Sequence, residues 1–184
     1  MSEIADRYRN VALAFTERVR EVPDERWDDP APCEGWVARD VVRHLVEWFP
    51  MLLRDGSGLQ VEAGPSIDDD PVAAWTVMSD GVQGLLDDPE VAAQQFSHPM
   101  AGDHRLDAFV DSFFTSDVLV HTWDLARATG LDEHLDPGEV SGMLGAMVPL
   151  DDMLRASGHY GPRVDVGDDA DDQTKLLAFL GRRP

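Results

Sequence analysis

The sequence has little cysteine, little positive charge and no long apolar segment. Cys33 is the only cysteine among 184 residues, so no disulfide can form within the chain. One thiol, together with the lack of a charged-then-apolar leader at the amino terminus, predicts a cytoplasmic protein. No apolar run approaches the roughly 20 residues that a membrane-spanning helix needs. We therefore expect no membrane partner.

Basic residues are scarce. The chain has 15 Lys and Arg against 36 Asp and Glu, which gives a formal net charge of -21. Such a surface repels nucleic acid and anionic lipid, so we expect neither as a partner. Hydrophobic residues make up 43% of the chain, as in an ordinary globular protein. At this length we expect a single domain over residues 1–184.

Strand-like alternation and internal repeats are also missing, and apolar residues recur at helical spacing instead. Pro50 is expected to kink or end the second helix, and Pro149 to bend the fifth. A short helix is also expected within the connection 88–102. The pattern predicts an all-α protein built as a helical bundle. The predicted helices cover residues 2–22, 37–54, 71–86, 105–129, 136–157 and 171–180.

Asp117 and His121 are the first candidate site residues. They are four apart in the longest helical pattern, so both side chains lie on one face of the helix. Zinc and similar ions bind His nitrogen and carboxylate oxygen, and catalytic sites commonly use three protein ligands. His44, in the apolar second helix, is the best third candidate. We predict a metal site formed by His44, Asp117 and His121.

Simpler interpretations exist for each of these residues. A carboxylate and a histidine at helical spacing often form only a hydrogen-bonded pair, and a lone His44 is more often a core histidine bonded to a carboxylate. The apolar neighbours Val118 to Val120 favour a metal, because a buried charge needs a partner. Cys33 is interpreted as a packed small residue rather than a nucleophile.

Other polar residues near the candidates remain open. Asp40 and Asp124 each lie about one turn from a candidate histidine, so they can accept a hydrogen bond from it or join the ligands, or be surface carboxylates. His98 and His104 border loops and are expected to face solvent. His159 and Tyr160 are expected in a loop.

Three segments of the chain resemble a known family. They are Pro32 to Leu45, which contains Pro-Cys-Glu-Gly-Trp and His44; Asp117 to Ala126; and a closing part with Gly-Pro-Arg-Val from Gly161 and the stretch Asp168 to Arg182. In order and spacing they resemble the DinB-like metal-binding superfamily. The closer resemblance is to the branch containing the amino-terminal domain of mycothiol-dependent maleylpyruvate isomerase, of actinobacterial type.

This resemblance implies a DinB-like four-helix bundle with additional short helices and a divalent ion, zinc first and nickel as the alternative. The ion is held by one His of the second helix and two ligands four apart on a later helix, which match His44, Asp117 and His121. Many relatives have His, and the isomerase Glu, where this chain has Asp117. The isomerase also carries a further carboxy-terminal domain. A homodimer is expected by family analogy.

Three functional hypotheses follow. The first is a metal-dependent transferase or isomerase that uses a small thiol such as mycothiol on an electrophilic substrate, with the ion lowering the pKa of the thiol or of a water. The second is a non-catalytic metal- or ligand-binding helical module in which the same residues tie two helices together. The third is a metal-free bundle in which His44 and Asp117 belong to a buried polar network.

Overall fold

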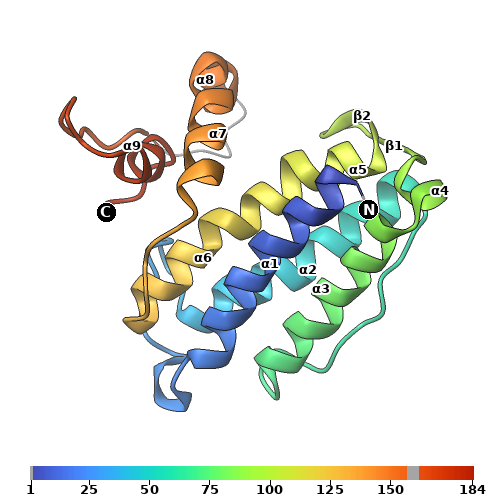
Figure 1. The fold of residues 1–184 in the computed structure, drawn as a ribbon. Helices are drawn as coiled ribbons and strands as arrows, with labels where there is room; N and C mark the ends of the chain where they lie inside the picture. The colour runs from blue at the N-terminus through green and yellow to red at the C-terminus, as the bar shows by residue number, and fades with distance from the viewer. Residues whose placement is uncertain (1, 157–161) are drawn as a thin grey trace.

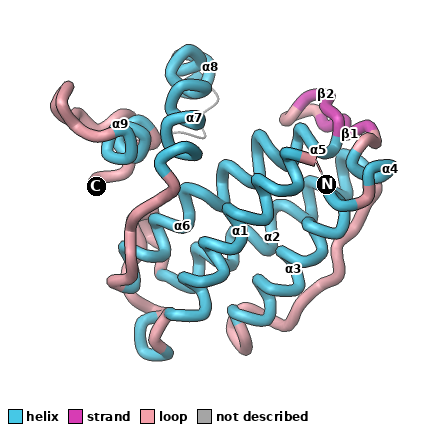
Figure 2. Tube along the Cα trace, viewed as in Figure 1, coloured by secondary structure: helices cyan, strands magenta, loops and turns pink. Residues whose placement is uncertain are grey.

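The computed structural model describes residues 2–156 and 162–184, which form helices and one small hairpin (Figures 1 and 2). The all-α prediction is confirmed. α1 packs against α3 and α6, and α2 packs against the same two helices, so α1 and α2 lie diagonally across the bundle. The long helices are α1 (Glu3–Glu21), α2 (Ala38–Ser57), α3 (Pro71–Asp87) and α6 (Ser116–Thr129).

Side-chain caps set the ends of these helices. Ser2, Asp70 and Asp136 each accept hydrogen bonds from first-turn backbone amides, and a proline follows each of the two aspartates at the first helical position. Gly58 and Gly130 end α2 and α6 with φ of 75° and 71°, where other residues are strained. Local chemistry therefore explains why the expected boundaries of the first and third helices are nearly right.

Two of the other predicted helices need correction. The second helix does not end at Arg54 but continues past Pro50 to Ser57, because packing on α3 and α6 outweighs one lost backbone bond. The predicted helix 105–129 is interrupted: a turn of α-helix and a π-helix precede α6. These pieces are α5 (Leu106–Phe109) and η2 (Val110–Thr115).

The predicted fifth helix is also divided. Pro149 lies in the 3-10 turn η3 (Val148–Leu150), so the regular α-helix is interrupted where the bend was expected. It separates α7 (Pro137–Met147) from α8 (Asp151–Ala156), while the predicted end at 157, like His159 and Tyr160, falls outside the described residues. The terminal helix is α9 (Asp172–Phe179), and it packs on α7 beside one end of the bundle (Figure 1).

A β-hairpin was not predicted. β1 (Gln95–His98) pairs antiparallel with β2 (Gly102–Arg105), after the expected short helix, α4 (Pro89–Ala92). With only four residues in each strand, the alternation is too short to detect in sequence. Phe96 is fully buried and stacks on Phe109 with ring centroids 3.6 Å apart, which fixes the hairpin to the bundle.

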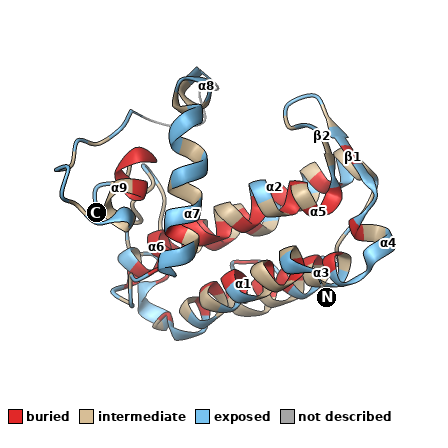
Figure 3. Ribbon diagram, turned by 45° about the horizontal axis from the view of Figure 1, so that its top comes forward, coloured by how far each residue is buried: buried red, intermediate tan, exposed pale blue. Residues whose placement is uncertain are grey.

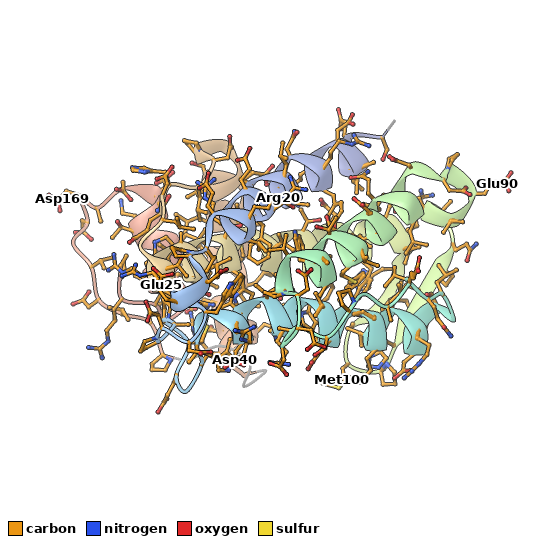
Figure 4. All side chains as sticks on the ribbon, turned by 90° about the horizontal axis from the view of Figure 1, so that it is seen from below. Arg20, Glu25, Asp40, Glu90, Met100 and Asp169 are labelled. Atoms are coloured by element: carbon orange, nitrogen blue, oxygen red, sulfur yellow. The ribbon has the colours of Figure 1, made fainter. Side chains whose placement is uncertain are left out.

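The core lies between the four long helices, whose buried residues face inward (Figure 3). Aromatic rings such as Trp75, Phe114 and Trp123 fill it. Most carboxylates are at least partly exposed, and Glu90 and Asp169 mark opposite ends of the molecule (Figure 4). Within residues 2–156 and 162–184, every helix is too short or too polar to cross a membrane. Between α1 and α2 runs the short 3-10 helix η1 (Asp24–Arg26).

Candidate metal centre

His44, Asp117 and His121 meet between α2 and α6. His44 Nε2 lies 3.1 Å from Asp117 Oδ2, and His121 Nε2 lies 3.4 Å from Asp117 Oδ1. One ligand atom from each residue can be chosen so that all three lie within 4.8 Å of one another. The tertiary structure thus brings together the three residues proposed from sequence, although metal binding itself stays a prediction.

The three side chains differ in exposure, and this decides how the site is reached. His121 is 5% exposed, whereas His44 and Asp117 are 31% and 29% exposed. The expectation that its apolar neighbours bury Asp117 is therefore only partly right: Val118 to Val120 and His121 are buried, whereas Asp117 is half-buried. The site is open to solvent on the side of His44 and Asp117, where a ligand can enter.

Asp124 orients His121. Its Oδ2 lies 2.9 Å from His121 Nδ1, and the carboxylate is fully buried. Burial alone would raise the pKa of Asp124, but His121 and Arg182 outweigh it and hold that pKa below its usual range. Since an ionised carboxylate only accepts, His121 Nδ1 carries the hydrogen and Nε2 points to Asp117. Of the three options left open for Asp124, the structure supports the hydrogen-bond partner of a histidine.

Arg182 completes this buried arrangement from the far end of the chain. It donates to Asp124 from Nε at 3.2 Å and from Nη2 at 2.7 Å. The pair joins residues 58 apart in sequence, just after α9 and within α6. A sequence pattern contains no signal for such a contact, so Arg182 was missed.

Cys33 and Asp40 have structural roles. The Cys33 thiol donates to Asp124 at 3.6 Å, and burial, helped by the charge of Asp124, raises its pKa to about 12. The thiol is therefore neutral and unsuited to nucleophilic attack, as the packing interpretation expected. Asp40 accepts from the Val37 amide at 3.1 Å and from Arg43 at 3.4 Å, which caps α2 rather than holding a histidine.

A second set of possible ligands shares His121. Within the described part of the chain, Cys33, His121 and Asp124 also present atoms within 4.8 Å of one another. However, the Arg182 guanidinium already contacts both Asp124 oxygens and lies 3.8 Å from the Cys33 sulfur. The chain therefore supplies its own cation at this second position, which leaves His44, Asp117 and His121 as the better candidate set for an ion.

Two tryptophans surround the histidines. The Trp36 ring centroid lies 5.1 Å from that of His44 and 5.9 Å from that of His121, stacked on the latter. Trp48 donates its indole N–H to Asp117 Oδ2 at 3.0 Å. Trp48 was not among the candidates from sequence, although its spacing of four from His44 on one helix was a usable signal.

His98 and His104 lie away from this centre, as expected. The Met100 amide donates to His98 Nδ1 at 3.2 Å, and His104 Nε2 donates to the Ala101 carbonyl at 2.6 Å. Both imidazoles are half-buried and stabilise the hairpin turn, so the expectation that they face solvent is only partly right.

The residues fit a divalent ion on two observations. A tetrahedral site with bonds of about 2.0–2.1 Å has ligand atoms about 3.4 Å apart, and each imidazole nitrogen lies near that distance from one Asp117 oxygen, His44 from Oδ2 and His121 from Oδ1. The electrostatics also suit a cation. Burial alone would raise the pKa of Asp117, but His121 and His44 outweigh it and hold that pKa far below its usual range. The carboxylate is thus a permanent anion facing two imidazoles.

Metal affinity should rise with pH. Burial alone would lower the pKa of His121, but Asp117 and then Asp124 raise it to about 9. The protonated imidazole stabilises the metal-free fold fully below the ordinary pKa of 6.5, and this contribution is lost as pH rises through about 9.

An ion must displace that proton, so zinc affinity should increase roughly tenfold per pH unit between about pH 6.5 and 8.5. Calorimetry in buffers of different ionisation enthalpy should detect about one released proton. Affinity independent of pH would contradict this assignment.

Together, the fold and the site define a helical-bundle protein with a histidine and carboxylate cluster between two of its long helices. The family model of the mycothiol maleylpyruvate isomerase N-terminal domain matches residues 8–126. The chain belongs to this family, which is of the DinB-like metal-binding type. The matched region contains His44, Asp117, His121 and Asp124, and ends before Arg182.

Two curated relatives extend the similarity beyond the family model. They are uncharacterized proteins of Mycobacterium tuberculosis, from strains CDC 1551 / Oshkosh and H37Rv. Each is 28% identical over 172 residues, which cover 92% of this chain and 92% of the relative. No solved structure matches the chain. These relatives indicate no reaction, so the function has to be inferred from the chemistry of the site.

Proposed function

We propose that this protein binds one divalent metal ion through His44, Asp117 and His121 and acts as an enzyme with a small thiol such as mycothiol. Zinc is the first choice and nickel the alternative, because both accept imidazole and carboxylate ligands. The observation that carries the proposal is the meeting of these three side chains on the open side of α2 and α6, within a chain of the mycothiol isomerase family.

A divalent ion at this site would lower the pKa of a thiol or water bound to it, and so supply a thiolate or hydroxide at neutral pH. The chain's own groups prepare this chemistry. Asp124 keeps the hydrogen of His121 on Nδ1 and leaves Nε2 for the ion. The exposed edges of His44 and Asp117 leave room for a thiol and an electrophilic substrate, as in an S-transferase or isomerase.

The alternative is a non-catalytic metal- or ligand-binding module. Structural metal sites fill the coordination sphere with protein groups, whereas catalytic sites keep one position for water or substrate. The solvent access of His44 and Asp117 favours the catalytic alternative. The negative charge favours a small molecule over nucleic acid or membrane as the partner. A cytoplasmic location and a homodimer remain parts of the proposal.

Binding of a thiol can be tested on the cobalt-substituted protein. Mycothiol added to this form should produce a thiolate-to-cobalt charge-transfer band, because cobalt takes the same ligands as zinc and reports them by absorption. The S-methylated thiol is the control and should give no band. If cobalt binds but mycothiol leaves the spectrum unchanged, the thiol hypothesis is rejected in favour of the non-catalytic module.

A further inference from the structure

The carboxylate of Asp117 is held by three neighbours that differ in chemistry. His44 Nε2 and Trp48 Nε1 both lie on Oδ2, at 3.1 and 3.0 Å. His121 Nε2 lies on the other oxygen, Oδ1, at 3.4 Å. The two imidazoles are candidate ligands, and a nitrogen that binds an ion can no longer donate a hydrogen bond. The indole N–H is different, because it is a donor only and cannot bind a metal ion.

We propose that Trp48 is a positioning residue that fixes the Asp117 carboxylate at the metal centre. This inference rests on the proposed metal site. Once His44 and His121 turn to the ion, Trp48 is the one of these three neighbours that still donates to Asp117. It occupies a lone pair of Oδ2 and limits rotation about the last side-chain torsion, which is otherwise broad in aspartate. The carboxylate then presents a defined oxygen to the ion.

Packing keeps the Trp48 donor in place. Its ring stands perpendicular to Phe49, with centroids 5.7 Å apart, and contacts Phe114 edge-on at 6.0 Å. Phe49 and Phe114 are fully buried, so the indole is supported by the rigid core. Trp48 also follows His44 by one turn of α2, with ring centroids at 5.8 Å. A donor locked by packing and a ligand on the same helix form a preorganised unit.

The competing explanation is that Trp48 only fills space. Trp48→Phe separates the two, because it keeps an aromatic ring against Phe49 and Phe114 and removes the N–H. The matched control is Trp36→Phe, which alters a tryptophan whose ring lies beside both imidazoles, tilted to His44 and stacked on His121. If the hydrogen bond matters, only the first variant should change the environment of the Asp117 carboxylate.

Two measurements test the proposal. Zinc affinity from competition with a chelator should fall at least about tenfold in Trp48→Phe, the usual effect of losing a hydrogen bond to a ligand, and less than about threefold in Trp36→Phe. The cobalt spectrum of Trp48→Phe should differ from that of the parent, which a purely structural role would not cause. In metal-free protein, the Trp48 indole N–H resonance should shift in Asp117→Asn.

The outcomes separate this inference from the proposed function. If the parent binds zinc and Trp48→Phe has the same affinity and cobalt spectrum, the role of Trp48 is refuted while the metal site stands. An unshifted indole resonance in Asp117→Asn also refutes it, since the bond would be absent in solution. If the parent binds neither zinc nor cobalt, the proposed function fails, and the inference that rests on it fails as well.

Discussion

Replacing His44 and His121 together by alanine should leave the purified protein with little zinc, whereas the parent should carry about one ion per chain. The double variant removes both nitrogen ligands and leaves Asp117, a single carboxylate that cannot hold the ion. Elemental analysis of protein dialysed against trace zinc measures the difference. At zinc concentrations about 100 times the dissociation constant, the parent should also gain about 2.7 kcal/mol of stability over its chelated form.

The matched control is His98→Ala/His134→Ala, which also removes two imidazoles. His98 lies in the hairpin and His134 is 92% exposed beside Asp132, so neither belongs to the centre. This variant should keep the parent's metal content. Equal and negligible metal in the parent and in both variants would reject the metal site and support the third hypothesis, a bundle with only a buried polar network.

Replacing Arg182 by alanine should lower the free energy of unfolding by about 3–5 kcal/mol, because it removes one of the two cationic partners of the buried Asp124 carboxylate. Asp124 is fully buried and the Arg182 side chain is 17% exposed, so water cannot replace the lost guanidinium. The loss is a large fraction of the roughly 5–15 kcal/mol that stabilises a typical domain. Urea denaturation of the metal-free proteins measures it.

Arg54→Ala serves as the comparison for this variant. Arg54 pairs with Asp55, and the two side chains are 56% and 49% exposed, so the pair should contribute less than about 1 kcal/mol. A similar small loss in Arg182→Ala would show that Asp124 is satisfied by His121 alone. In that case the carboxy-terminal segment would not contribute to the stability of the site.

The sequence predicted those features that depend on residues within a turn or two of each other. Apolar residues at helical spacing place α1 and α3 nearly where they lie. The spacing of Asp117 and His121 puts both on one face of α6. In an α-helix each backbone N–H bonds to the carbonyl four residues earlier, so these features can be predicted without knowledge of tertiary contacts.

The π-helix η2 is a feature that local sequence patterns did not predict. It lies directly before α6 and widens the turn, although the apolar spacing of residues 105–129 predicted one regular helix. Its Phe114 stacks on Phe49 of α2, with ring centroids 4.1 Å apart. Packing of such rings between helices outweighs the preference for a regular α-helix. The balance between these two energies cannot be predicted from the sequence alone.

By itself, then, the sequence determined the all-α class, most helices and one pair of candidate ligands. Only the tertiary structure decided that His44 reaches Asp117, that Trp48 donates to the same carboxylate, and that Arg182 closes the network around Asp124. The physical reason is the range of the interactions. Helices follow from hydrogen bonds and caps between near neighbours, whereas the site follows from the way α2, α6 and the segment after α9 pack together.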